Sequence, residues 1–316
     1  MPKTTTKTKS KKVLVTGGAG FIGSTLVDRL VAEGFSVAVV DDLSNGRREY
    51  LNPEARFYKV GLTSPKLAGV FAKEKPSAVF HLAAHIDARV SVMDPIHDAE
   101  INVHGSLRVL EACIATGVKK LVFASSGGAI YHDTKSFPTK ETEAPSPLTP
   151  YGISKLAFEH YLKAANHHFG IAYAALRYAN VYGPRQDQKG EGGVIGVFCK
   201  ALLDGRRPTI FGGGKQTRDF IYVDDVVEAN LKALASSKSG VWHVATGKET
   251  SVNAVARMIA DAFGWKKGFG KGPTPSGDVQ RSCLDASKAK KDLGWKPDVD
   301  VALGIRRTAA WFKTRR

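Results

Sequence analysis

Tyr151 and Lys155 are four residues apart at the start of a segment with the apolar pattern of a helix. Residues with this spacing share a helix face, so the phenol and the ammonium are expected to lie side by side. An unperturbed phenol has a pKa of about 10 and is a poor base at neutral pH. A neighbouring positive charge lowers that pKa because it favours the phenolate. The pair therefore predicts proton exchange with a substrate hydroxyl.

The same spacing occurs a second time, at Tyr131 and Lys135. Pro138 follows this second pair closely, and proline cannot continue a helix. The residues after Lys155 can continue one. Only Tyr151 and Lys155 thus have a scaffold that fixes their geometry. We assign catalysis to them, over the alternative of an incidental surface pair.

Ser125 and Ser126 end an apolar run that has the character of a buried strand. The carboxyl ends of strands in open α/β sheets face the ligand crevice. A serine hydroxyl at this place can share a hydrogen bond with the reacting substrate hydroxyl. The alternative is a serine pair that only caps the end of the strand.

A glycine-rich turn links the first apolar strand to an amphipathic helix. Gly17, Gly20 and Gly23 recur at every third position, with Phe21 and Ile22 between the last two. Such a turn lets the backbone approach a pyrophosphate, whose charge then lies at the helix N-terminus. Glycine is needed where a side chain would collide with the ligand or with the next strand. These five residues are our first candidates for dinucleotide binding.

Asp41 and Asp42 end the next strand-like run, and Asp41 lies 18 positions after Gly23. A doubly wound fold places its ribose-binding acid in this region. A carboxylate accepts both ribose hydroxyls and repels a 2′-phosphate, so the cofactor is expected to be NAD. The alternative role of Asp41 is to cap the following turn. Arg47 and Arg48 follow closely, which keeps NADP open as a second cofactor.

The elements that would position these residues alternate between strand-like and helix-like patterns. Several strands are almost continuously apolar, as buried parallel strands are. The rhythm predicts an α/β fold, a Rossmann-like doubly wound parallel sheet. The expected strands lie near 12–16, 36–41, 56–60, 78–83, 119–125 and 171–178, and the expected helices near 21–33, 97–116 and 150–168.

The alternation of strand-like and helix-like segments ends after Arg177, where glycine-rich loops and shorter helical patterns appear. We expect residues 1–11 to form a disordered basic tail. Residues 12–178 would form the NAD-binding domain, with return segments near 219–245. Residues 179–316 would form mainly a smaller substrate-binding lobe.

Composition excludes several classes of function. The chain has 316 residues and a formal net charge of +16, with much of the excess near its two ends. No helical pattern carries a basic stripe with interleaved aromatic residues, which speaks against nucleic-acid binding. No apolar run approaches the ~18 residues of a membrane span, and the first twelve residues lack a hydrophobic signal. Three widely spaced cysteines predict neither a metal site nor a disulfide framework, which favours the cytoplasm.

Together these residues resemble the extended short-chain dehydrogenase/reductase family, specifically its NAD-dependent epimerase/dehydratase branch. The resemblance runs from Val13 to about Pro297 and is strongest to the nucleotide-sugar 4-epimerases. It implies NAD as cofactor, a UDP-hexose as substrate, and epimerisation at C4 through a 4-keto intermediate. Further blocks that carry it are His81–Ala84, Arg89–Ser91, Pro95, Asn102–Val103, Leu176–Gln186, Arg218–Asp225 and Leu293–Pro297.

The resemblance also implies roles for further residues. Ala83 and Ala84 would line the cofactor site and Asn102 would pack near the nicotinamide. Asn180 would bind the sugar diphosphate and Arg218 would clamp its phosphates, unless Arg218 pairs with Asp219 or another acid. The remaining candidates are Ser125, Tyr151, Lys155 and Tyr178 for the cofactor, and Ser126, Tyr151 and Val194 for the substrate.

Several positions depart from the family pattern. Gly127 stands where the family has a catalytic serine or threonine, so we nominate Ser126, with a water molecule as the alternative. Gly61 stands where an aspartate contacts adenine, so adenine must be recognised differently. Arg281 would replace a phosphate-binding arginine that is absent at Pro275. Ser282 is small at the position that limits space near the sugar's C2, which predicts tolerance of N-acetylhexosamines.

Gly128 and Ala129 stand where dehydratases of the family carry acids, so elimination lacks its general acid. One alternative function is a dehydrogenase or reductase of another sugar nucleotide. The other is a non-catalytic NAD-sensing or RNA-binding relative. The family also implies a homodimer through helices 97–116 and 150–168. Apolar positions on these helices lie at the interface or face the sheet, among them Leu107, Leu110, Leu156 and Phe158.

Overall fold

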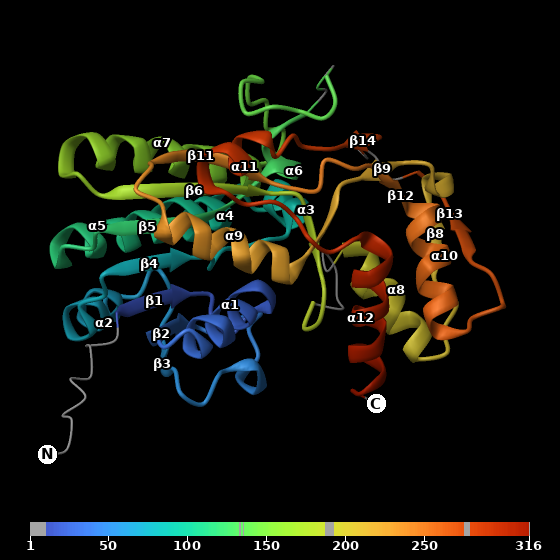
Figure 1. Cartoon of the computed structure of the whole chain (residues 1–316), viewed down its shortest axis with the longest axis horizontal. Helices are drawn as coiled ribbons and strands as arrows, with labels where there is room; N and C mark the ends of the chain where they lie inside the picture. The colour runs from blue at the N-terminus through green and yellow to red at the C-terminus, as the bar shows by residue number, and fades with distance from the viewer. Residues whose placement is uncertain (1–10, 133, 135, 187–192, 275–278, 316) are drawn as a thin grey trace, which may run out of the picture.

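A computed structural model describes residues 11–132, 134, 136–186, 193–274 and 279–315 (Figure 1). The expected disordered tail, residues 1–11, lies outside the described residues except for Lys11. Lys135 of the second Tyr/Lys pair lies outside them too.

A sheet of seven parallel strands forms the larger part of the molecule, in the order β11-β6-β5-β4-β1-β2-β3. The Rossmann-like fold predicted from the alternating patterns is thereby confirmed. Four of the five residues of β1 are buried, which explains its continuous apolar sequence. The strands are β1 (Lys12–Thr16), β2 (Ser36–Asp41), β3 (Arg56–Lys59), β4 (Ala78–His81), β5 (Lys120–Ser126), β6 (Ala172–Tyr178) and β11 (Gly240–Val244).

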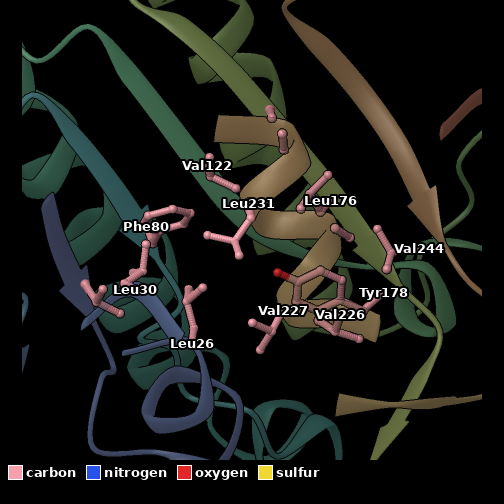
Figure 2. Packing of buried hydrophobic residues seen from close by; sticks show 14 of the residues in the cluster. Leu26, Leu30, Phe80, Val122, Leu176, Tyr178, Val226, Val227, Leu231 and Val244 are labelled. Carbon is pink, nitrogen blue, oxygen red and sulfur yellow. The ribbon is translucent and has the colours of Figure 1, made fainter. Parts of the chain in front are cut away.

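Helices cover both faces of this sheet. On one face α1 (Phe21–Ala32) lies beside α9 (Val223–Ala235), and both bury apolar side chains against the strands, as Figure 2 shows. On the other face lie α2 (Lys66–Glu74), α5 (Ser106–Thr116) and α7 (Pro150–Phe169). The helix that begins at Pro150 therefore has its buried side directed at the sheet.

The helix expected over 97–116 is interrupted. It begins as α4 (Pro95–Ala99), passes through the π-helical turn η2 (Glu100–Gly105) and continues as α5. A π turn inserts an extra residue into the helix and often marks a functional site. Two short helices that the sequence did not indicate, α3 (Ala88–Met93) and α6 (Gly127–Ile130), lie next to α7.

The second lobe has its own core, built around Tyr182, Phe198, Phe220, Ile259 and Phe312. Its helices include α8 (Gly193–Leu203), α10 (Val252–Phe263) and α12 (Val301–Lys313), at the right of Figure 1. Its strands are β7 (Asn180–Tyr182), β8 (Thr209–Phe211), β9 (Thr217–Arg218), β10 (Phe220–Tyr222), β12 (Thr250–Ser251), β13 (Gly270–Gly272) and β14 (Arg281–Ser282). The remaining elements are α11 (Ser287–Leu293) and the 3₁₀ turns η1 (Arg48–Tyr50) and η3 (Gly212–Gly214).

The two segments expected to return to the main sheet behave differently. Residues 240–244 do return, as β11 beside β6. Residues 220–222 instead pair with β7 in a separate two-stranded sheet. We therefore propose that the cofactor domain consists of residues 12–178 together with 223–244.

No helix among the described residues is both long and apolar enough to cross a membrane. Within the same residues, no three side chains of the metal-ligating types gather at one place.

Candidate active site

The glycine-rich turn forms one wall of a cavity of about 400 Å³ at the carboxyl ends of β1, β2, β4 and β5. Gly17 has a φ of +71°, and a Cβ there would lie 2.6 Å from the backbone nitrogen of Ala83. A Cβ on Gly23 would lie 2.0 Å from the carbonyl oxygen of Gly17. A Cβ on Gly20 would approach only that oxygen, at 3.3 Å. Gly17 and Gly23 thus close the turn, and Gly20 leaves room for a ligand at the start of α1, where Phe21 and Ile22 also line the cavity.

Asp41 ties the glycine turn to the end of β2. Its carboxylate accepts hydrogen bonds from the backbone N–H groups of Ala19 and Leu43, each at 2.9 Å. Burial raises the pKa of Asp41, although these hydrogen bonds oppose the rise. A carboxylate has about four acceptor sites, so two stay available to ribose hydroxyls. Capping the turn and binding a ribose are therefore compatible roles for this residue.

Asp42 is exposed beside the same cavity and accepts a hydrogen bond from Ser44 N–H at 2.9 Å. A Cβ on Gly61 would lie 3.5 Å from Asp42 Oδ2. Gly61 lacks the acid of the family, but Asp42, directly after β2, places a carboxylate next to the same part of the cavity.

Tyr151 and Lys155 both line the cavity from the first turns of α7. Thr149 caps this helix by accepting from Gly152 N–H, and Pro150 occupies its first turn, where it is favoured. Lys155 Nζ donates to the carbonyl oxygen of Ala124 at 2.8 Å and lies 5.6 Å from the centroid of the Tyr151 ring. The structure thus brings the predicted pair together at the end of β5.

Burial lowers the pKa of Lys155 to about 8, against the opposing effect of Asp98 and Glu159. The charge that favours the phenolate is therefore lost as pH rises through about 8. We expect kcat/KM to fall about tenfold for each pH unit above that value. A pH profile between 6 and 10 measures this, and a profile that stays flat to pH 10 would contradict it.

The stability of the unliganded protein depends on the same lysine, but in the opposite direction with pH. The unfolded state binds more protons between pH 8 and about 10.5, so this group makes the fold more stable as pH rises through that window.

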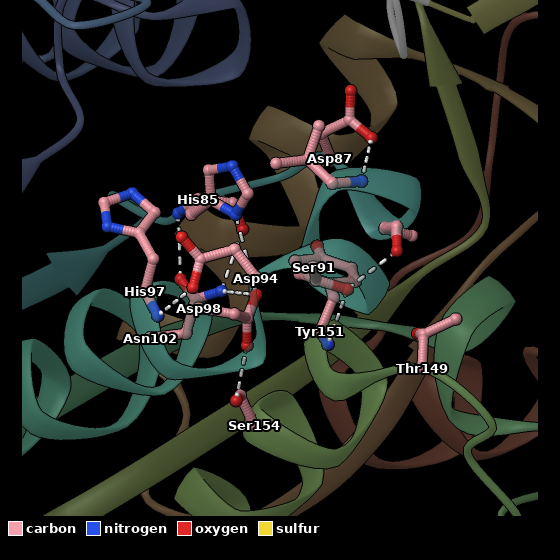
Figure 3. A network of polar contacts seen from close by, with 12 residues as sticks. His85, Asp87, Ser91, Asp94, His97, Asp98, Asn102, Thr149, Tyr151 and Ser154 are labelled. Carbon is pink, nitrogen blue, oxygen red and sulfur yellow. Dashed lines mark hydrogen bonds and ion pairs between the residues drawn. The ribbon is translucent and has the colours of Figure 1, made fainter.

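A polar cluster holds the start of α7 against α3, α4 and η2 (Figure 3). Ser154 Oγ donates to Asp98 Oδ2 at 2.7 Å, and Tyr151 N–H donates to Ser91 Oγ at 3.2 Å. Asn102, predicted to lie near the nicotinamide, uses its amide to bind Asp98 and both backbone groups of His85. Asn102 therefore fixes the segment after β4, in which Ala83, Ala84 and His85 line the cavity.

The two candidate serines have different surroundings. Ser125 lines the cavity and donates to the buried Glu159 at 2.6 Å. Ser126 is the N-cap of α6, where its oxygen accepts from Ala129 N–H at 3.3 Å. It is not among the residues that line this cavity or the second one described below.

Leu284 fills the space where a side chain at Gly127 would lie. A Cβ on Gly127 would lie 2.2 Å from Leu284 Cδ1. The buried Asp219 holds this leucine in place by accepting from Leu284 N–H and from the N–H groups of Thr246 and Gly247. Residue 127 thus lacks the hydroxyl of the family, and the distant Leu284 fills the space that such a side chain would need.

We expect Gly127→Ser alone to cost about 1–3 kcal/mol of stability, because the added atoms overpack this contact. Leu284→Ala makes room for the new side chain, so adding Gly127→Ser to Leu284→Ala should cost nothing. Urea unfolding of the two single variants and the double variant measures this coupling. Additive losses would show that Leu284 does not exclude the hydroxyl.

Tyr178 lines the cavity from the end of β6, but its hydroxyl is bound to Asn230 of α9. Burial raises the pKa of Tyr178, so it stays a neutral phenol. Its ring, rather than its hydroxyl, is what it presents to a cofactor.

A second cavity of about 320 Å³ lies in the smaller lobe. Three of the predicted substrate-binding residues line it, namely Asn180, Val194 and Arg218. Gln186 and Gln216 line it as well, and their side-chain oxygens are buried without a partner among the described residues. Neither glutamine was among the predicted site residues, although Gln186 ends the block Leu176–Gln186 that carried the family resemblance and Gln216 lies two residues before the block Arg218–Asp225.

Arg281 and Ser282 form β14, which pairs with β9, so that Ser282 lies opposite Arg218. The Arg281 guanidinium is bound by Glu249 at 2.6 and 3.0 Å. A phosphate would have to compete with this carboxylate for Arg281. Pro275 lies outside the described residues.

Residues 13–245 match the NAD dependent epimerase/dehydratase family. The chain belongs to this family, and its cofactor is NAD. The glycine turn, Asp41 and the space at Gly20 fit such a dinucleotide.

Similar proteins extend along nearly the whole chain. A UDP-glucose 4-epimerase of Mycolicibacterium smegmatis is 43% identical over 96% of this chain and 99% of its own length. The crystal structure of UDP-glucose 4-epimerase from Thermotoga maritima with UDP-glucose is 45% identical, covers 96% of this chain and 99% of that one, and has a TM-score of 0.94. A UDP-N-acetylglucosamine 4-epimerase from Methanobrevibacter ruminantium is 36% identical over 98% of this chain and 100% of its own, with a TM-score of 0.92.

Proposed function

We propose that this protein interconverts UDP-glucose and UDP-galactose by inverting the configuration at C4. The observation that carries the proposal is the Tyr151–Lys155 pair, which lines the dinucleotide cavity where β5 ends. The named relatives support the same reaction. NAD bound in this cavity would supply a hydride acceptor for C4 that is regenerated within each turnover, so no cofactor would be consumed.

Tyr151 carries the proton in this mechanism. Its phenolate accepts the proton of the C4 hydroxyl as the hydride leaves C4. Its hydroxyl returns that proton to the C4 oxygen once the 4-keto sugar has turned its other face. Lys155 stabilises the phenolate by its charge, and Ala124 O orients the ammonium. A hydroxyl from Ser126 or a water would hydrogen-bond the same oxygen.

The second cavity is our proposed site for the UDP group. The guanidinium fork of Arg218 suits a diphosphate, and Asn180 lies on the same wall. Gln186 and Gln216 offer unpartnered acceptor oxygens to donors of the nucleoside. In the first cavity, Asp42 would accept a hydrogen bond from the adenine amino group of NAD. It would take the role that an aspartate at the position of Gly61 has in the family.

Ser282 leaves space near the sugar, and the archaeal UDP-N-acetylglucosamine 4-epimerase has the same fold. We therefore expect comparable kinetics on UDP-glucose and UDP-N-acetylglucosamine. Strict rejection of the N-acetylated sugar would contradict this tolerance. Elimination is disfavoured because α6 consists of Gly127, Gly128, Ala129 and Ile130 and offers no acid.

The direct experiment is to incubate the pure, NAD-loaded protein with UDP-galactose and no added cofactor. Formation of UDP-glucose without release of NADH supports the epimerase. Stoichiometric NADH would identify a dehydrogenase of another sugar nucleotide. Salt-sensitive RNA binding without any sugar turnover would identify a non-catalytic relative.

We also propose that the protein is a homodimer. Leu110 and Phe158, two of the four positions considered for the interface, are buried in the core and face the sheet. Five exposed apolar side chains lie instead on α3, on α4 and on or just before the start of α7. They are Val92 at 54% exposure, Met93 at 85%, Ile96 at 81%, Leu148 at 64% and Ile153 at 53%. A second copy covering this patch would also brace the helix that carries Tyr151.

Met93→Glu combined with Ile96→Glu is expected to convert the dimer into a monomer, because the two charges would be buried in the interface. Light scattering coupled to size-exclusion chromatography measures the mass. Phe169→Glu is the control, since Phe169 is 61% exposed at the opposite end of α7. An unchanged mass of the double variant would place the interface elsewhere.

The three cysteines are free and buried, which supports a reducing compartment. We propose the cytoplasm as the place of function.

A further inference from the structure

Arg185, in the smaller lobe, lines the dinucleotide cavity that the glycine turn also lines. It follows β7, and neither the sequence analysis nor the proposed mechanism gives it a role. Its neighbour Gln186 lines the second cavity. Two consecutive residues thus belong to the walls of two different cavities.

Two contacts fix the Arg185 side chain, and its backbone conformation is unusual. Its Nη2 lies 2.8 Å from Asp28 Oδ2 on α1. Its guanidinium carbon lies 5.6 Å from the centroid of the Tyr50 ring. Its backbone adopts a φ of +68°, which non-glycine residues rarely accept without compensation. The chain therefore holds one arginine in a strained conformation to place its fork at this spot.

The other arm of the fork ends in Nη1. Nη1 is buried and has no hydrogen-bond partner among the described residues. A buried donor of a charged group is costly when it lacks an acceptor. Asp28, the acid that contacts this arginine, is bound through the other nitrogen, Nη2. The ligand of the cavity that Arg185 lines can supply such an acceptor.

We propose that the free arm of Arg185 binds a phosphate oxygen of the dinucleotide, and that Asp28 positions the guanidinium for it. A planar fork suits this task, since one arm can hold a carboxylate while the other holds a phosphate. The backbone N–H groups at the start of α1 would contact the pyrophosphate from the opposite side. The smaller lobe would thereby take part in retaining NAD.

The test measures cofactor affinity by calorimetry on the NAD-free protein. Arg185→Met is expected to raise the Kd of NAD and of ADP about 10- to 100-fold, and to leave the Kd of adenosine, which has no phosphate, unchanged. Arg185→Lys keeps the charge but loses the fork and should fall in between. Arg108→Met is the control, since Arg108 pairs with Glu111 on the surface of α5, away from the cavity.

Asp28→Asn tests whether Arg185 contacts the ligand or only joins its segment to α1. It removes the charge of the ion pair but keeps an oxygen that can accept from Nη2, so the guanidinium stays positioned and the Kd of NAD should change less than threefold. The proposal is overturned if Arg185→Met changes that Kd less than threefold, if adenosine weakens as much as ADP, or if Asp28→Asn reproduces the full loss. These readouts do not depend on turnover, so a failure to epimerise UDP-galactose would be a separate result.

Discussion

Replacing Tyr151 by phenylalanine is expected to lower kcat for UDP-galactose about a thousandfold. The change removes one hydroxyl and leaves the ring beside Lys155 in place, so the loss isolates the proton transfer. The bound NAD should stay, because the other walls of the cavity are untouched. Steady-state kinetics and the absorbance of released cofactor measure the two quantities.

Tyr161→Phe is the matched control for this experiment. Tyr161 lies on the same helix α7 but is 45% exposed and does not line the cavity. Its variant should keep wild-type kcat. A Tyr151→Phe protein that retains more than a tenth of the activity with full NAD occupancy would remove the phenol from the mechanism.

The second large effect concerns stability and begins at Glu159, one turn after Lys155. Its carboxylate accepts from both Nε and Nη2 of Arg177, at 3.0 and 2.6 Å, and from Ser125 Oγ. Arg177 also donates to Tyr131, whose hydroxyl lies 2.8 Å from His243 Nε2. Glu159 and Arg177 are each 5% exposed. The network joins β5, β6, β11 and α7 behind the cofactor cavity.

Glu159→Gln should destabilise the protein by about 3–5 kcal/mol, because it leaves the charge of Arg177 buried without its partner. The melting temperature should fall by roughly 5–15 °C. Glu33→Gln is the control, since Glu33 forms an exposed pair with Arg29 and should cost less than about 1 kcal/mol.

A double variant tests whether the loss of stability comes from the unpaired charge of Arg177 or from other contacts of the two side chains. Glu159→Leu with Arg177→Met replaces both charges by apolar groups and should recover most of the loss. Thermal and urea unfolding of all variants provide the comparison. A Glu159→Gln protein no less stable than Glu33→Gln would contradict the assigned role.

The doubly wound parallel sheet could be predicted because its signals are local. β1, β2 and β5 each contain a continuous apolar run, and the glycine turn directly follows β1. The same holds for Tyr151 and Lys155, whose spacing on one helix fixes their proximity. The smaller lobe was harder, because β9, β12 and β14 are two-residue strands without a pattern of their own.

The parts that the sequence did not reveal depend on contacts between distant segments. Nothing near Gly127 indicates that Leu284 occupies its side-chain space. Arg185, Gln186 and Gln216 stand out only because the fold leaves one polar atom of each without a partner. The π turn at Glu100–Gly105 comes from a shift in backbone hydrogen bonding that no residue type marks.

The placement of β11 has a consequence for how the protein is made. This strand ends at Val244 and completes the sheet beside β6, while α9 covers the face that α1 shares. A nascent chain that has left the ribosome only as far as Tyr178 exposes the apolar edge of β6, which invites aggregation. Completion of the cofactor half must wait until residues 223–244 have left the ribosome. Expression of residues 1–178 alone should therefore yield insoluble protein. The 316-residue chain contains β11, which covers the edge of β6.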